Sequence, residues 1–106
     1  MPGVYTVTQM NSYIKNMFRQ DFVLSRISVK GEVSNCKYHT SGHIYFSLKD
    51  GQGVMSAIMF AGSAKNLEFR LENGMQVIVS GRIDVYERDG KYQLYANAIE
   101  ADGQGD

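Results

Sequence analysis

A chain of 106 residues that is 43% hydrophobic and 21% charged has the size and composition of one globular domain. This excludes two independent cores and an intrinsically disordered chain. Eleven Lys and Arg balance eleven Asp and Glu, so no overall positive charge points to a nucleic-acid partner. Residues 1–70 nevertheless hold eight basic and four acidic side chains, whereas residues 71–106 hold three and seven. The fold therefore decides whether the basic part forms a surface patch.

The sequence carries no signal for export or for membrane insertion. Cys36 is the single cysteine, which rules out an intramolecular disulfide framework and favours a reducing compartment. The longest apolar runs have four or five residues, against the roughly 20 that a membrane-spanning helix needs. The N-terminus also lacks the basic start and apolar stretch of a secretory signal. We expect a soluble protein of the cytoplasm.

The first predicted element is a helix over residues 6–20. Thr6 and Gln9 have the spacing of a capping box, in which each side chain accepts a hydrogen bond from the other residue's backbone N–H. Apolar side chains then recur at intervals of three and four residues, at Met10, Tyr13, Ile14, Met17 and Phe18. This stripe is typical of an amphipathic helix. We expect it to pack on the core as a lid or plug.

Five strands are predicted in the rest of the chain, because apolar and polar residues there alternate with a period of two. In order, they span residues 26–34, 43–49, 54–60, 75–87 and 91–99. A polar loop is expected at 35–42 and a short helix at 61–69. The pair Asp89-Gly90 is a strong hairpin signal between the last two strands.

Five strands with a helix between the third and the fourth have the connectivity of the OB-fold, a small Greek-key barrel. Gly31 and Gly81 lie in mid-strand, as expected for the strongly coiled first and fourth strands of such a barrel. An SH3-like barrel and a split α+β sheet are the competing folds. We predict a mainly β protein with one domain over residues 1–101, its barrel at 25–100, and the start of a linker at 102–106.

The outward faces of the predicted strands and their loops interleave cations with tyrosines. Single-stranded nucleic acid binds when cations neutralise its phosphates and aromatic rings stack on its bases. In OB-folds the oligonucleotide crosses strands two and three between the flanking loops. The other interpretation is a solvated face with half-buried tyrosines at the barrel rim. The predicted binding residues are Arg26, Lys30, Asn35, Lys37, Tyr38, His39, His43, Tyr45, Lys49, Arg82, Tyr86, Arg88, Lys91 and Tyr95.

Metal binding and catalysis find little support in the residue pattern. Cys36, His39 and His43 could supply three zinc ligands, but a structural zinc site takes four, and the sequence holds no second Cys or His cluster. Asp84 and Glu87 would point to opposite faces of a strand, which separates the acids that a two-metal nuclease needs close together. Nucleophile-elbow, P-loop and zinc-protease motifs are also absent from the sequence. We predict no cofactor, no metal and no catalytic residue in this chain.

Several longer blocks occur in order along nearly the whole chain. They cover residues 5–15, 29–35, 41–50, 59–60, 74–77 and 85–95. Together these blocks resemble the start of the large subunit of exodeoxyribonuclease VII. The resemblance implies an N-terminal OB-fold domain that binds DNA, with a nuclease domain and a long helical region later in the subunit.

The resemblance also implies a parent enzyme that degrades single-stranded DNA from both ends to oligonucleotides without requiring a divalent metal. Many small subunits assemble on each large subunit of that family. This chain would then be the DNA-binding domain without the catalytic residues. Its expected partners are single-stranded DNA and, through parts of the parent outside this chain, the small subunit.

Two other functions remain open at this point. Phe46, Leu48, Lys49 and Asp50, followed by a glycine-containing turn, are also similar to anticodon-binding domains of class II aminoacyl-tRNA synthetases. Ser56 stands about where those domains have a base-reading glutamine, which weakens that alternative. The overall charge neutrality favours a third function, a protein-interaction barrel that binds no nucleic acid.

Overall fold

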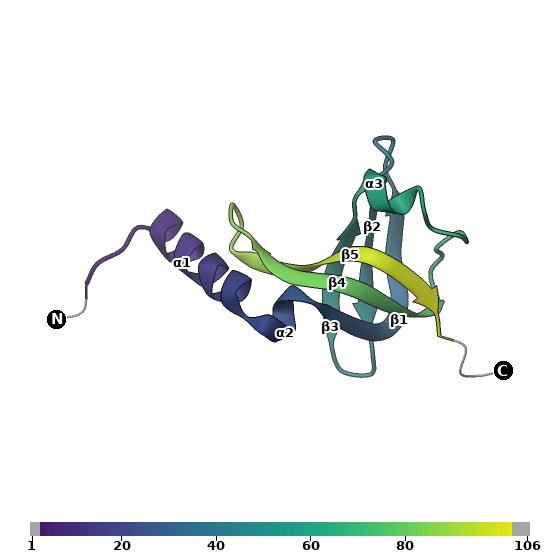
Figure 1. Cartoon of the computed structure of the whole chain (residues 1–106), viewed down its shortest axis with the longest axis horizontal. Coiled ribbons are helices and arrows are strands. Elements are labelled where there is room, and N and C mark those ends of the chain that lie inside the picture. The colour runs from purple at the N-terminus through teal and green to yellow at the C-terminus, as the bar shows by residue number, and fades with distance from the viewer. Residues whose placement is uncertain (1–2, 103–106) are drawn as a thin grey trace.

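Five strands close into a barrel in the computed structural model, which describes residues 3–102 (Figure 1). Around the barrel the order is β1-β2-β3-β5-β4, and β4 pairs with β1. Only β3 and β5 run parallel, and the other neighbouring strands are antiparallel. The elements are α1 (Val7–Gln20), α2 (Phe22–Ser25), β1 (Ile27–Tyr38), β2 (Ile44–Lys49), β3 (Val54–Met59), α3 (Ala61–Ala64), β4 (Gln76–Tyr86) and β5 (Lys91–Ala101). The predicted mainly β fold, with a helix before the barrel and one between β3 and β4, is confirmed.

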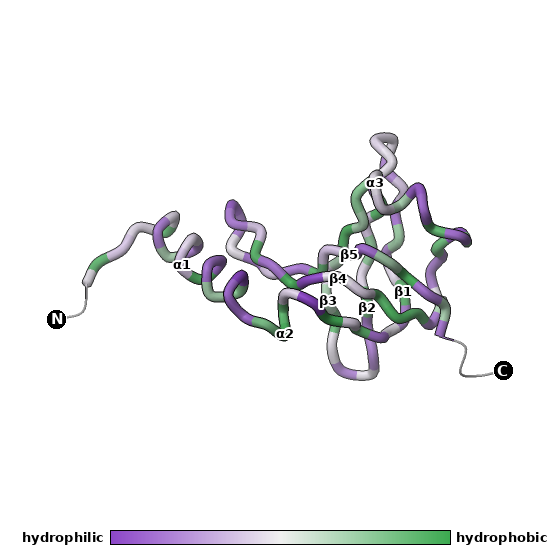
Figure 2. Tube along the Cα trace, in the orientation of Figure 1, coloured by the Kyte–Doolittle hydropathy of each residue, from purple (hydrophilic) through white to green (hydrophobic). Residues whose placement is uncertain are grey.

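The barrel interior is filled by the apolar positions that the period-two pattern predicts. On β2, Ile44, Phe46 and Leu48 are buried, and the residues between them face outward. More and less exposed positions also alternate along β1 and along β4 as far as Ile83 (Figure 2). The buried cluster consists of Val33, Ile44, Phe46, Leu48, Ala57, Met59, Leu71, Val77, Val79, Ile83, Leu94, Ala96 and Ile99. The core therefore fixes which side chains point into solvent.

Two predicted boundaries are wrong. The first half of the polar loop expected at 35–42 is strand, because β1 continues to Tyr38 and pairs there with β2. A bulge between Ser34 and Lys37 allows this, with Asn35 in the left-handed region at φ 50°. The helix expected at 61–69 is only the single turn Ala61–Ala64, and no side chain caps its N-terminus. Residue 103 and those after it, part of the predicted linker, lie outside the described residues.

Helix α1 begins as predicted but does not plug the barrel. The capping box is present, since the Gln9 N–H donates to Thr6 Oγ1 at 3.0 Å and the Thr6 N–H donates to Gln9 Oε1 at 2.9 Å. No α1 residue is buried, and the helix extends beside the β4–β5 hairpin, away from the barrel (Figure 1). The expectation that its apolar stripe packs on the core is wrong, except for Phe18, which contacts the core in part. Within residues 3–102, no helix is long and apolar enough to cross a membrane.

Polar side chains attach α1 to an unpaired edge of β4. Pairing between β1 and β4 reaches only Gly81, so β4 continues beyond it without β1 alongside. Asn11 Nδ2 donates to the Glu87 carbonyl oxygen at 3.0 Å, and Lys15 Nζ donates to the Val85 carbonyl oxygen at 2.7 Å. A helix that supplies donors to exposed strand carbonyls protects the edge from pairing with another chain.

Asp84 is the acidic centre of this attachment. Its side chain is buried, and its Oδ2 lies 3.3 Å from Lys15 Nζ and 3.4 Å from Arg19 Nε. Burial by itself raises the pKa of this carboxyl. The Val85 N–H and the two α1 cations outweigh burial, so the pKa of Asp84 lies below its ordinary value.

Replacing Asp84 with asparagine is expected to lower the free energy of unfolding by about 1–3 kcal/mol at pH 7, because charge-assisted hydrogen bonds are lost. A carboxyl with a lowered folded-state pKa stabilises above its ordinary pKa of about 3.9 and loses that contribution as the pH falls toward the folded-state pKa. The difference between wild type and Asp84→Asn should therefore shrink below about pH 4. Urea unfolding at several pH values measures this. Glu68→Gln, at an exposed position, is the control, and an equal loss in both variants would contradict the account.

Candidate nucleic-acid interface

A row of five outward side chains crosses all five strands of the barrel. The strand pairings align Lys37, Tyr45, Ile58, Tyr95 and Arg82, which lie on β1, β2, β3, β5 and β4. Residues paired on neighbouring strands share one face of the sheet. We call these five residues the transverse row. It has a cation at each end, and two tyrosines flank an isoleucine at its centre.

The two tyrosines of the transverse row differ in how firmly they are held. The Arg82 guanidinium lies 4.7 Å from the centroid of the Tyr95 ring, and Gln93 Nε2 donates to the Tyr95 hydroxyl at 2.9 Å. Tyr45 is 42% exposed, whereas Ile58, between the two tyrosines, is 6% exposed. The row thus has one fixed ring and one accessible ring, with a buried isoleucine between them.

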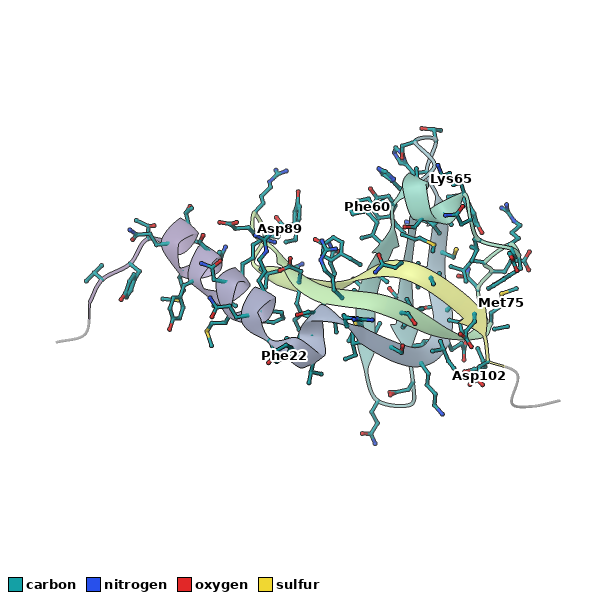
Figure 3. All side chains as sticks on the ribbon, viewed as in Figure 1. Phe22, Phe60, Lys65, Met75, Asp89 and Asp102 are labelled. Carbon is teal, nitrogen blue, oxygen red and sulfur yellow. The ribbon has the colours of Figure 1, made fainter. Side chains whose placement is uncertain are left out.

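Three more rings extend the transverse row toward the β1–β2 loop, and we call them the loop cluster: His39, His43 and Phe60. The ring of Phe60 lies 5.1 Å from His43 and 5.9 Å from Tyr95, measured between centroids. The ring of Tyr45 meets both histidines edge-on, at 6.1 and 6.5 Å. Phe60 follows β3 directly and lies beside α3 (Figure 3). The loop cluster and the row form one continuous aromatic surface.

The backbone fixes the orientation of both histidine rings. His43 Nδ1 accepts a hydrogen bond from the Ala61 N–H at 2.9 Å, and His39 Nδ1 accepts one from the Ser41 N–H at 3.1 Å. In the neutral rings the proton is then on Nε2, which becomes a hydrogen-bond donor. With the lysine and arginine at the ends of the row, this surface combines aromatic rings, cations and hydrogen-bond donors.

Tyr38, another predicted binding residue, contacts the segment before β4. Its hydroxyl donates to the Leu71 carbonyl oxygen at 3.0 Å and accepts from the Leu71 N–H at 2.7 Å. The Arg70 guanidinium lies 4.3 Å from the centroid of its ring. Tyr38 therefore ties the segment before β4 to the end of β1, and it does not belong to the transverse row.

The other predicted residues lie along the strands on either side of the row. Lys49 is four residues from Tyr45 on β2, which is about 13 Å, and its Nζ lies 3.9 Å from Glu32 Oε2. Tyr86 is equally far from Arg82 on β4. The remaining ones are Arg26 before β1, Lys30 and Asn35 on β1, and Arg88 and Lys91 at the hairpin beside α1. The structure thus brings Lys37, His39, His43, Tyr45, Arg82 and Tyr95 together and leaves the other eight apart.

Ile58 and Phe60 belong to this surface but were not predicted as binding residues. The period-two pattern of β3 contains the signal, because Ser56, Ile58 and Phe60 alternate with the inward Ala57 and Met59. The residue type of Ile58 conceals this outward position, because isoleucine is typical of a core residue.

The cysteine and histidines that could have supplied zinc ligands make other contacts in the structure. Cys36 Sγ lies 3.6 Å from the Leu71 carbonyl oxygen, and burial raises the pKa of its thiol more than Arg70 lowers it. His43 Nδ1 is used by the Ala61 N–H. Among residues 3–102, no three His, Cys, Asp or Glu side chains are grouped so that they could hold a metal ion.

A family profile of OB-fold nucleic acid binding domains matches residues 5–100, which is nearly the whole chain. The chain belongs to this family. The OB-fold domain is 67% identical over 105 residues to "Exodeoxyribonuclease 7 large subunit" of Lachnoclostridium phytofermentans, covering 99% of this chain and 26% of that relative. It corresponds to the N-terminal part of such subunits, which confirms the resemblance. The chain spans about a quarter of the length of the curated relatives that it matches.

Solved structures with low sequence identity share the fold. An asparaginyl-tRNA synthetase from Pyrococcus horikoshii superposes with a TM-score of 0.56 at 20% identity, over 74% of this chain and 20% of that one. A replication protein A heterotrimer bound to single-stranded DNA gives a TM-score of 0.59 at 16% identity, over 74% and 58% of the two chains. Both likenesses concern the fold of this OB-fold domain.

Proposed function

We propose that this OB-fold domain binds single-stranded DNA across the transverse row. The observation that carries the proposal is the alignment of Lys37, Tyr45, Tyr95 and Arg82 across neighbouring strands, with Ile58 at its centre. Bases stack on Tyr45 and on the rings of the loop cluster, while the two cations at the ends neutralise phosphates. A single strand fits this surface because its bases are free to leave the stack, whereas a duplex keeps them paired inside.

The spacing of the strands sets the distance between the two tyrosines of the proposed contact. Tyr45 and Tyr95 are separated by two strand spacings, about 10 Å, and the buried Ile58 lies between them in the strand pairing. The Nε2–H groups of His39 and His43 supply hydrogen bonds to phosphate or base oxygens at one side. Stacking accepts every base, so we expect little sequence preference.

We further propose that the domain serves a longer nuclease subunit. Support comes from relatives that are about four times as long and carry the name of an exodeoxyribonuclease large subunit. In this proposal the domain presents single-stranded DNA to a nuclease region outside this chain, and the whole enzyme degrades it from both ends to oligonucleotides. Small subunits bind the parent outside this chain, and the enzyme works in the cytoplasm.

An anticodon-binding function is the second nucleic-acid candidate. It is favoured by the fold likeness to an asparaginyl-tRNA synthetase. The outward Ser56 on β3, where such domains have a glutamine, argues against it. Oligoribonucleotides in the binding test below distinguish the two functions.

Fluorescence anisotropy with labelled oligonucleotides tests the proposed function. We expect the 106-residue chain to bind single-stranded DNA weakly and more tightly than duplex of equal length. Because the transverse row offers two cations, Lys37 and Arg82, the log–log salt slope should be shallow, about −1.4 at roughly 0.7 per neutralised phosphate. Tighter binding to duplex, a preference for RNA stem-loops, or no binding at low salt would contradict the proposal.

A further inference from the structure

Strand β5 loses its neighbour on one side before it ends. The pairing of β3 with β5 ends at Ile58 and Tyr95, after which the chain leaves β3 and enters α3. β5 continues to Ala101, and within residues 3–102 only β4 pairs with that last part of it. We call residues 97–101 the β5 edge. Such an edge presents backbone N–H and C=O groups to whatever lies beside it.

Two residues of the β5 edge direct their backbone groups away from β4. The Asp102 N–H donates to the Gln76 carbonyl oxygen at 2.9 Å. Residue pairs in an antiparallel ladder alternate between those that exchange hydrogen bonds and those that do not. Glu100 therefore bonds to β4, whereas the N–H and C=O groups of Ile99 and Ala101 point to the open side. In the described part of the chain, no backbone hydrogen bond joins these two residues to the segment after α3.

A groove of about 340 Å³ runs along the β5 edge, and all five residues of the edge line it. Residues 66–69, which follow α3, line it as well. Its apolar lining comes from Met59, Leu67, Phe69 and Ile99. The described lining includes no residue of the transverse row or the loop cluster, and the end of β5 lies away from α1 (Figure 1). The groove is therefore distinct from the surface proposed for DNA.

Open backbone groups beside an apolar groove suit an extended peptide, which adds to a sheet edge as a further strand. Such a peptide would take the place next to β5 that β3 leaves. Side chains that are paired across neighbouring strands point to the same face of the sheet. The peptide residue opposite Ile99 therefore faces the apolar lining of the groove, and the next residue lies on the outer face beside Glu100.

The charges of the groove decide which peptide fits. Glu68 and Glu100 line it, and no lysine or arginine is among its described lining residues. Opposite charges on paired strands stabilise the pairing, and like charges weaken it. Glu100 thus favours a lysine or arginine beside it. It also argues against a second copy of this chain, because pairing two β5 edges would bring two Glu100 carboxylates onto one face.

We propose that the β5 edge binds an extended protein segment in which basic residues alternate with apolar ones. The apolar side chains enter the groove, the basic ones lie beside the two glutamates, and the segment's backbone bonds to Ile99 and Ala101. This interaction does not depend on the proposed function. The domain can then hold a protein partner at the β5 edge while its transverse row stays accessible.

Fluorescence anisotropy with a labelled hexapeptide of alternating lysine and valine tests the charge requirement in the absence of DNA. Glu100→Lys should weaken binding by about tenfold, because the substitution turns an attraction into a repulsion. Glu72→Lys, at an exposed position outside the groove lining, is the matched control and should change the affinity little. A peptide of alternating glutamate and valine should show the reverse preference for wild type and Glu100→Lys. Equal losses in both variants, or no binding to wild type at low salt, would overturn the proposal.

Hydrogen exchange tests the strand addition itself. At saturating lysine–valine peptide, the Ile99 and Ala101 amides should exchange about tenfold more slowly, because they gain hydrogen bonds. The Glu100 amide, already bonded to β4, should change little. A peptide with every backbone nitrogen methylated keeps its charges but cannot donate these bonds, so it should bind far more weakly. Equal binding of the methylated peptide, or unchanged exchange at Ile99 and Ala101, would refute strand addition.

Discussion

Replacing Tyr45 with alanine is expected to weaken binding of single-stranded DNA by about 5- to 150-fold, equivalent to 1–3 kcal/mol for one lost stacking contact. Tyr45 lies in the transverse row, and the residue is 42% exposed. The buried face of β2 consists of Ile44, Phe46 and Leu48, so removing Tyr45 opens no cavity in the core. Anisotropy gives the affinity, and a thermal melt should change little.

Two further variants sharpen this test. Tyr45→Phe keeps the ring and should bind nearly as well as wild type. Tyr86→Ala removes the same residue type at nearly the same exposure, 43%, but beside the hairpin. If Tyr86→Ala lost as much affinity as Tyr45→Ala, the DNA would run along the hairpin and the transverse row would not be its main contact. A large drop in melting temperature for Tyr45→Ala would instead mean that Tyr45 supports the core.

Replacing Gly81 with alanine is expected to lower the free energy of unfolding by about 3 kcal/mol or more, at the upper end for overpacking. A Cβ at Gly81 would overlap the Tyr95 carbonyl oxygen and meet Ala96 Cα at 3.1 Å. These are backbone atoms of β5, so no side-chain rotation relieves the contact. The bulge between Ser80 and Gly81 brings the two strands this close.

Gly62→Ala is the matched control for Gly81→Ala. Gly62 lies in α3, and a Cβ there meets nothing within 4 Å. The free energy of unfolding of the Gly62→Ala protein should therefore stay the same or rise slightly. Urea unfolding of both variants gives the comparison. A Gly81→Ala protein as stable as wild type would show that β4 and β5 separate easily, and that Tyr95 is less firmly held than its contacts indicate.

The strands could be predicted because their periodicity reports the barrel interior directly. Each inward residue of β2 and β4 contributes to one shared core, so the alternation and the fold agree. The stripe of α1 has the same kind of pattern, but periodicity reveals only that a face is apolar. It does not reveal what covers that face, and here the polar residues Asn11, Lys15 and Arg19 make the contact.

The candidate site was predictable only in part. The outward orientation of Tyr45 follows from local alternation, because Ile44 and Phe46 must point inward. Its alignment with Tyr95 depends on the parallel pairing of β3 with β5, which joins segments far apart in the sequence. Tyr38 was expected in the loop after the first strand, but it lies at the end of β1, where its hydroxyl is tied to Leu71, a residue far away in the sequence.

Mapping of the bound oligonucleotide on the 106-residue chain tests the central claim most directly. In an NMR titration with single-stranded DNA, the largest chemical-shift changes should fall on the transverse row and the loop cluster, including the backbone amides of Tyr45, Ile58 and Tyr95. The amides of α1 and of the hairpin at Arg88 should change little. Changes confined to the hairpin and α1, or none at saturating DNA, would contradict the claim that the barrel face binds the strand.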